Sequence, residues 1–238
     1  MKAVFFDVDF TLIYPGPTFD GEGYRKFAER YKIHTDPARF ESAVAAASVE
    51  LTRSQGDIYN PEPFIRYAER VIREMGGDGP GLEACARMIY DEWAACHHFS
   101  LYDDVVTVLG DLHASGIRIG LISNTHRCLA SFQAHFELDP FITAAVSSSE
   151  HGYLKPHPSI FRAALELVGV AASESVMVGD SLAHDIAGAH QVGMRAVLLA
   201  RSGLPTDRLD GVPVIRTLTE LPGVLWSLGA GGSRVNFT

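Results

Sequence analysis

The sequence predicts an α/β protein: a doubly wound, Rossmann-like parallel sheet with an all-helical segment inserted after its first strand. Three observations lead to this fold class. A short apolar run, residues 3–6, opens the chain; residues 15–102 show helical periodicity; and apolar runs alternate with helical stripes over residues 103–228. Alternation of this kind is typical of a parallel sheet with helices on both faces. The opening strand belongs with the second half, which makes the helical segment an insertion.

The composition predicts an ordinary soluble globular protein. The chain has 238 residues, of which 47% are hydrophobic and 21% charged, and this length allows one large domain or two. A formal charge of −9 argues against nucleic acid or an anionic membrane as the main partner. An anionic substrate would therefore need a metal ion or a few placed cations.

The N-terminal residues and the cysteine spacing favour a cytoplasmic location. Asp7 and Asp9 interrupt the N-terminal apolar run, which is unlike a signal peptide, and no run approaches the length of a membrane span. Cys85, Cys96 and Cys128 form no CxxC pair, so we expect neither a disulfide framework nor a zinc site. The sequence says nothing about oligomeric state.

The expected elements follow from apolar spacing and from proline and glycine positions. After the strand at residues 3–6, the run Tyr14-Pro15-Gly16-Pro17 predicts a loop, and no strand is expected between residues 21 and 99. Helices are expected around residues 24–31, 40–51, 64–75, 82–96, 105–112, 126–136, 160–168, 183–191 and 218–228. Strands are expected at 117–122, 142–146, 175–178, 196–199 and 212–215, and a flexible tail at 229–238. The α/β core would thus comprise 1–14 and 103–228.

Polar residues follow the predicted strands where parallel strands should end at one crevice. Asp7 and Asp9 follow the first strand, and two adjacent acids repel unless a cation or a shared proton separates their roles. Either acid alone could be a helix cap, but the pair is harder to explain in that way. Ser123, Asn124 and Thr125 precede the helix expected to begin at His126, so they predict either an anion site or simple N-capping.

Further charged groups follow the later strands. Asp180 and Asp185 come after residues 175–178, and four acids in one crevice favour a hard divalent cation such as Mg²⁺. Lys155 stands before Pro156, which restricts its backbone to extended conformations. A lysine held in this way could offset the negative charge of a substrate, although an exposed loop lysine is the ordinary alternative.

Taken together, these residues resemble the four motifs of the haloacid dehalogenase (HAD) superfamily, in the expected order. Asp7-Val8-Asp9-Phe10-Thr11 is similar to the first motif, Ser123 to the second, Lys155-Pro156 to the third, and Gly179 through Asp185 to the fourth. The helical insert between the first two motifs resembles the cap of the C1-capped, subfamily I members.

The resemblance implies a role for each residue. Asp7 would be the nucleophile that forms an aspartyl-phosphate, and Asp9 the general acid and base. Ser123, Asn124 and Lys155 would bind the phosphoryl group. The residues implied at the Mg²⁺ site are Asp7, Asp9 through its backbone carbonyl, Asp180 and Asp185, the last acting through bound water or by fixing Lys155.

The resemblance also implies a reaction class. Relatives that displace halide lack an acid at the Asp9 position, so Asp9 favours hydrolysis of a small phosphorylated metabolite over dehalogenation. A sugar phosphomutase of the same fold remains the alternative, followed by a catalytically idle interaction module. Lys26 and Lys32, the lysines of the insert, are expected at the surface and not as Schiff bases. Phe10 stands where similar sequences usually have glycine. It could form an aromatic wall near the substrate or pack beneath the cap, and we expect packing.

Overall fold

The computed structural model describes residues 1–54, 56–201, 203 and 211–230. Within these residues, a six-stranded sheet forms the centre of the molecule, and every pair of neighbouring strands in it is parallel. In spatial order the strands are β5 (Ile142–Ser147), β4 (Arg118–Ser123), β1 (Ala3–Phe6), β6 (Ser175–Gly179), β7 (Arg195–Leu199) and β8 (Val214–Ile215). The opening strand β1 therefore lies in the middle of the sheet, as the sequence predicts.

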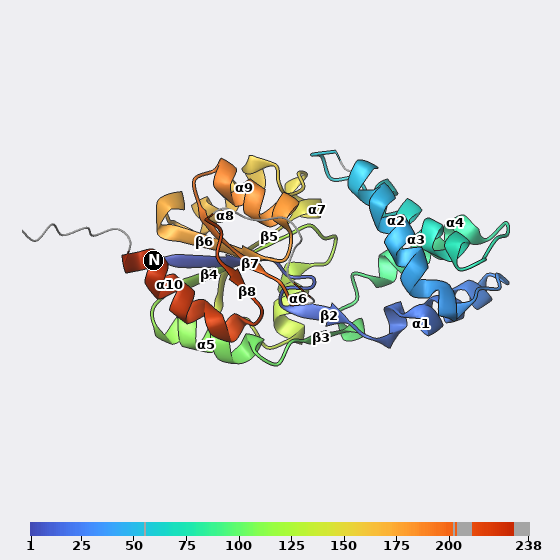
Figure 1. The fold of residues 1–238 in the computed structure, drawn as a ribbon, viewed down its shortest axis with the longest axis horizontal. Helices are drawn as coiled ribbons and strands as arrows, with labels where there is room; N and C mark the ends of the chain where they lie inside the picture. Colours follow the sequence, from blue (N-terminus) through green and yellow to red (C-terminus); the bar gives the residue numbers. More distant parts are fainter. Residues whose placement is uncertain (55, 202, 204–210, 231–238) are drawn as a thin grey trace, which may run out of the picture.

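Helices cover both faces of the sheet (Figure 1), which confirms the doubly wound fold class. Alternate residues of β1 point to opposite faces: Val4 and Phe6 pack in one apolar cluster, and Ala3 and Phe5 pack in the other. The first cluster includes α5 (Val105–Ala114), α6 (Leu129–His135) and α10 (Leu221–Ala230); the second includes α8 (Pro158–Val168) and α9 (Ala187–Gln191). A short helix, α7 (Ser148–His151), follows β5.

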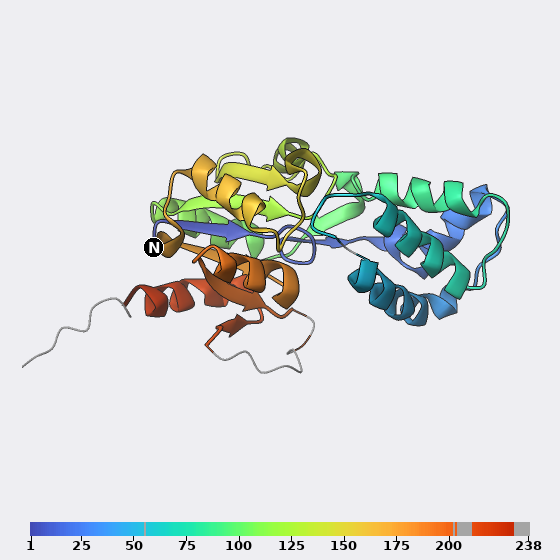
Figure 2. The same cartoon turned by 90° about the horizontal axis from the view of Figure 1, so that it is seen from above.

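The inserted segment forms a separate helical lobe, called the cap below. It contains α1 (Gly21–Arg30), α2 (Phe40–Ser54), α3 (Glu62–Glu74) and α4 (Leu82–Glu92). Their apolar stripes meet in one cluster, to which α3 contributes Ile65, Val71 and Ile72. Figure 2 shows β1 running from the N-terminus toward this lobe, so the cap lies beyond the carboxyl ends of the strands.

A two-stranded antiparallel ribbon joins the cap to the sheet, and the sequence did not predict it. Strand β2 (Ile13–Pro15) pairs with β3 (Phe99–Leu101), so both passages of the chain between the lobes run side by side. Each strand is three residues long, too short for a visible alternation, and β2 lies in the stretch expected to be a loop.

The cap also contacts the sheet lobe through the loop between α2 and α3. The amide of Tyr59 donates to the carbonyl of Gly152 at 2.9 Å, and the amide of Leu154 donates to the carbonyl of Asp57 at 2.8 Å. These bonds continue an isolated bridge between Ile58 and Tyr153. The cap is thus attached on a second side, close to Lys155.

Several predicted boundaries shift. The helix expected to begin at His126 begins at Leu129, and the helix expected at residue 183 starts with a π-helical turn, Leu182–Ile186. Helix α10 extends to Ala230, two residues into the predicted tail; residues 231–238 lie outside the described part of the chain. No helix among the described residues is long and apolar enough to cross a membrane.

Candidate active site

Lys155 lies at the centre of the residues that follow the strands. Its Nζ donates to Oδ1 of Asp7 at 2.6 Å, to Oδ1 of Asp185 at 2.6 Å and to the carbonyl of Ile122 at 2.9 Å. All three ammonium protons thus have acceptors, although the residue is only 3% exposed. Burial alone would lower the pKa of Lys155, but the carboxylates of Asp185 and Asp7 raise it overall, so the amine stays charged.

Asn124 fixes the backbone of Lys155. Its side-chain Nδ2 donates to the Lys155 carbonyl at 3.0 Å, and its Oδ1 accepts from the Lys155 amide at 2.7 Å. The side chain predicted to bind phosphate therefore holds the loop that carries the lysine. A direct contact of Asn124 with phosphate stays a prediction.

Asp7, Asp180 and Asp185 form a cluster in which one oxygen of each lies within 4.8 Å of the others. Both oxygens of Asp185 accept hydrogen bonds, one from Lys155 and one from the amide of Ser181 at 3.0 Å. Asp180 is the exposed member of the cluster, whereas Asp7 and Asp185 are buried. Loss of hydration and the negative charges of Asp7 and Asp185 raise the pKa of Asp180 to about 8. Such a cluster of carboxylates can hold a divalent cation.

The approach of Asp185 to its strand depends on a glycine. A β-carbon on Gly179 would lie 2.2 Å from Oδ2 of Asp185, which is closer than any real contact. Glycine at the end of β6 therefore lets the carboxylate reach both Lys155 and the backbone of the next turn. Packing therefore explains why the Gly179-Asp180-Ser181 motif begins with glycine, in addition to the chemistry of its aspartate.

Asp9 points to a different partner, Arg127, which the sequence reasoning missed. Arg127 Nη1 lies 3.0 and 3.2 Å from the two carboxylate oxygens of Asp9, and Nη2 donates to the carbonyl of Trp93 at 2.7 Å. The guanidinium also lies 4.3 Å from the centre of the Phe99 ring. Burial raises the pKa of Asp9, and the charge of Arg127 opposes this shift only in part.

The side-chain hydroxyl of Ser123 is buried and is a candidate hydrogen-bond donor in the site. The residue is 1% exposed, and its Oγ has no hydrogen-bond partner among the described residues. It ends β4, beside β1, so it lies next to the strand that delivers Asp7. Buried hydroxyls are usually satisfied by protein or solvent, which makes this atom a natural donor to a bound oxygen. Its position fits the predicted role in phosphate binding.

Phe10 does not pack beneath the cap, so that expectation is wrong. Its side chain is 46% exposed and lines a cavity between the cap and the sheet, with its ring centre 6.3 Å from that of Trp93. Its φ angle is +62°, a left-handed conformation that favours glycine. The backbone geometry explains why glycine suits this position, and it aims the phenylalanine ring into the cavity.

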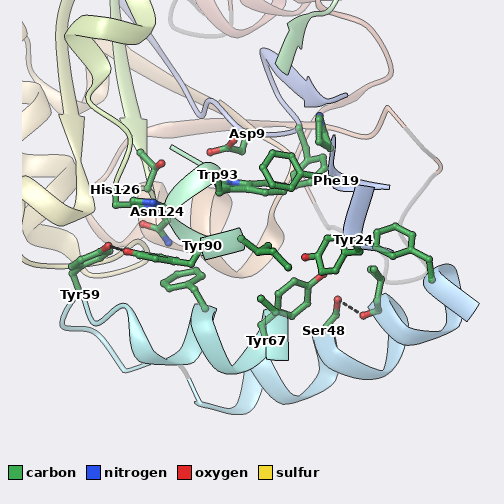
Figure 3. A pocket seen from close by; sticks show the side chains of 18 residues that line it. Asp9, Phe19, Tyr24, Ser48, Tyr59, Tyr67, Tyr90, Trp93, Asn124 and His126 are labelled. Carbon is green, nitrogen blue, oxygen red and sulfur yellow. Dashed lines mark hydrogen bonds between the residues drawn. The ribbon is translucent and has the colours of Figure 1, made fainter. Parts of the chain in front are cut away.

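That cavity has a volume of about 490 Å³ and adjoins the catalytic candidates through Asp9, Asn124 and Thr125. In Figure 3, Asp9 borders it on the side of the sheet, and Tyr67 and Ser48 border it on the side of α3 and α2. Its size suits a small molecule. A molecule in this cavity would meet Asp9 at the inner end.

Comparison with known proteins shows the family to which the chain belongs. Residues 1–193 match the family model described as a haloacid dehalogenase-like hydrolase. The chain is 31% identical over 215 residues to a glyceraldehyde 3-phosphate phosphatase of Methanopyrus kandleri, covering 84% of each chain. It is 32% identical over 203 residues to a ribulose-1,5-bisphosphate 5-phosphatase of Halopiger xanaduensis, covering 82% of this chain and 83% of the relative.

A solved structure extends the similarity to the whole fold. The HAD phosphatase of Thermococcus onnurineus superimposes with a TM-score of 0.65 at 27% identity, covering 99% of this chain and 100% of that one. The cap and the sheet therefore occur together in a phosphatase of this fold. The chain belongs to the haloacid dehalogenase-like hydrolases and is an enzyme of their phosphatase type.

Proposed function

We propose that this enzyme hydrolyses a small-molecule phosphate monoester through an aspartyl-phosphate on Asp7, with Mg²⁺ as its cofactor. The observation that carries the proposal is the 2.6 Å contact between Lys155 Nζ and Asp7 Oδ1. Burial raises the pKa of Asp7, and the buried ammonium opposes this shift, which favours the ionised carboxylate needed for attack. The same ammonium offsets the charge of the incoming phosphoryl group. The reducing environment suggested by three free cysteines supports a cytoplasmic location.

The carboxylates of Asp7 and Asp9 carry out different steps of the reaction. Asp7 attacks phosphorus, and the bond between phosphorus and the ester oxygen breaks. Asp9 donates a proton to the departing oxygen and then takes one from the water that hydrolyses the aspartyl-phosphate. Burial raises the pKa of Asp9, which favours the protonated form that the departing oxygen requires, and Arg127 holds the carboxylate in one orientation.

The residues around the acidic cluster fit a magnesium ion. Asp7 and Asp180, together with the Asp9 carbonyl that the resemblance implies, would hold Mg²⁺. The ion would shield the nucleophile from the substrate's charge and orient the phosphoryl group. Asp185 has both oxygens hydrogen-bonded, so we assign it to positioning Lys155 and the backbone of Ser181. The unpartnered Ser123 hydroxyl donates to a phosphoryl oxygen.

The proposal is tested by phosphate release from a panel of phosphate esters, with Mg²⁺ and with EDTA, in the wild type and in Asp7→Asn. We expect release that needs Mg²⁺ and is lost in Asp7→Asn, together with a hydroxylamine-sensitive phosphoprotein in the wild type. Release that persists in Asp7→Asn would refute the mechanism. Isomerisation of a sugar phosphate with little phosphate released would identify a phosphomutase instead.

A further inference from the structure

The cavity beside Asp9 indicates which kind of alcohol the substrate contains. This step rests on the proposed function: if Asp9 protonates the departing oxygen, the alcohol part of the ester must extend from Asp9. Asp9 and Asn124 line the cavity on the side of the sheet, whereas residues of α1, α2, α3 and α4 line it on the side of the cap (Figure 3). The alcohol part would therefore occupy this cavity.

The walls of the cavity are mainly aromatic. Rings enter it from the cap and from the sheet lobe, among them Phe10, Tyr24, Phe64, Tyr67, Tyr90 and Trp93. They also pack against one another: the Phe64 and Tyr90 ring centres are 6.4 Å apart, and Tyr90 stacks on His126 at 3.9 Å with 14° between the planes. Aromatic walls favour an aromatic guest through burial and edge-to-face contacts.

The cavity offers nothing to pair with a second anionic group. Among the described residues that line it, Asp9 is the one with a formal charge, and that charge is negative. The nearby cation, Arg127, is 1% exposed and already bonded to Asp9 and to the Trp93 carbonyl. A second phosphate or a carboxylate on the alcohol would lose its hydration without gaining a partner.

The polar atoms of the wall are neutral donors and acceptors. Burial raises the pKa of both Tyr24 and Tyr67, so these phenols keep their protons. The hydroxyls of Tyr59 and Tyr90 bond to each other. His126 has a buried Nε2 without a partner among the described residues, and burial lowers the pKa of its ring, which keeps it uncharged. Such groups suit an isolated polar atom of a guest.

We propose that the substrate is a phosphate monoester of an uncharged aromatic alcohol, whose ring occupies the cavity between the cap and the sheet. The proposal sets this chain apart from its ribulose-1,5-bisphosphate 5-phosphatase relative, whose named substrate carries a second phosphate. Hydrolysis takes up one water and releases the aromatic alcohol and inorganic phosphate.

The first test compares three primary phosphate esters of similar intrinsic reactivity with Mg²⁺ present: benzyl phosphate, 4-carboxybenzyl phosphate and glycerol 3-phosphate. We expect kcat/KM for benzyl phosphate to exceed the other two by about 100-fold, since one methylene in an apolar pocket is already worth roughly tenfold. Equal values, or a preference for glycerol 3-phosphate, would overturn the substrate class while leaving the phosphatase mechanism in place.

A variant that introduces a positive charge tests the cavity directly. Phe64→Arg places a cation among the aromatic rings, so the preference should move toward 4-carboxybenzyl phosphate by tenfold or more, and a misfolded protein would lose both activities instead. Trp226→Arg is the matched control, because Trp226 is 82% exposed on α10 and does not line the cavity. An unchanged preference in folded Phe64→Arg, judged by its circular dichroism, contradicts the proposal.

Binding can be measured without turnover. The chain has two tryptophans, so in Trp226→Phe the fluorescence reports Trp93, which lines the cavity. Benzylphosphonate, which cannot be hydrolysed, should change this emission in a saturable way, whereas 2,3-dihydroxypropylphosphonate should not. A response to benzylphosphonate in a protein that hydrolyses no ester would support the cavity assignment and refute the proposed function. No response, or an equal response to both compounds, would refute the cavity assignment.

Discussion

Arg127 joins the candidate acid Asp9 to the cap: its guanidinium bonds to both oxygens of Asp9 at 3.0 and 3.2 Å and to the carbonyl of Trp93 at 2.7 Å. Asp9 belongs to the segment that follows β1, and Trp93 is the C-cap residue that directly follows α4. One side chain thus couples the orientation of the proton donor to the position of the lobe that closes the substrate cavity.

Replacing Arg127 with Met should shift the pH dependence of kcat/KM to higher pH. The charge of Arg127 lowers the pKa of Asp9, so its loss should raise this pKa further, and the alkaline limb of kcat/KM should move to higher pH. The free energy of unfolding should fall by about 3 kcal/mol, because a buried carboxylate loses its partner. Arg118→Met is the control: Arg118 bonds to the carbonyls of Val168 and Gly169, so its loss should reduce stability without moving the limb.

Replacing Lys155 with Met should abolish most of the activity. The substitution leaves Asp7 and Asp185 buried with no cation between them, so we expect kcat to fall by about 10³ and stability to fall by 3–5 kcal/mol at about neutral pH. Phosphate release and urea unfolding measure the two effects. If kcat remains within a factor of ten of wild type in the folded variant, Lys155 has no part in the chemistry.

Magnesium binding should strengthen as the pH rises. The pKa of Asp180 is about 8 in the metal-free chain, so below that pH a proton competes with the cation. Because this folded-state pKa lies above the unfolded value of 3.8, the contribution of Asp180 to stability is present below about pH 4 and is lost as the pH rises through about 8.

Calorimetric titrations with Mg²⁺ at pH 6 and pH 8 test this linkage. The wild type should bind more tightly at pH 8 and release protons at pH 6, whereas Asp180→Asn should bind weakly and lose most of the pH dependence. Thermal unfolding in EDTA should show the wild type losing stability relative to Asp180→Asn between these pH values. Equal Mg²⁺ affinity of the wild type at pH 6 and pH 8 would mean that Asp180 does not ligate the ion.

Two substitutions of Phe10 should separate the free-energy cost of its backbone conformation from its contact with the substrate. At φ +62° a β-carbon costs about 1 kcal/mol, so Phe10→Gly should be more stable than Phe10→Ala by about that amount in urea unfolding. Both variants lose the ring that lines the cavity, so both should raise KM for benzyl phosphate. An unchanged KM in both would remove Phe10 from the substrate contacts.

Most of the candidate site was predictable from the sequence. Asp7, Ser123 and Asp180 each follow a predicted strand, and parallel strands end at one edge of a sheet, so their meeting follows from topology. Asp185 was predicted from its place after a strand and Lys155 from the restraint that Pro156 puts on its backbone, and the resemblance added their roles. The fold class followed from periodicity alone, because a buried strand and an amphipathic helix each leave a local pattern of apolar residues.

Other features depend on contacts that leave no local pattern. Arg127 and Asp9 are 118 positions apart, and a buried arginine in a loop looks like any surface cation until its partner is placed. The ribbon of β2 and β3 joins segments too short to show alternation, and each is stable only because the other is beside it. The aromatic cavity likewise exists only when the cap stripes, which read as ordinary helix cores, face Phe10 and Asp9 across the two lobes. The sequence by itself determined the order of the elements and the chemistry at the strand ends, because both are written in local patterns. Tertiary structure alone decided what holds Asp9 and what surrounds the substrate, because those contacts join residues far apart in the chain.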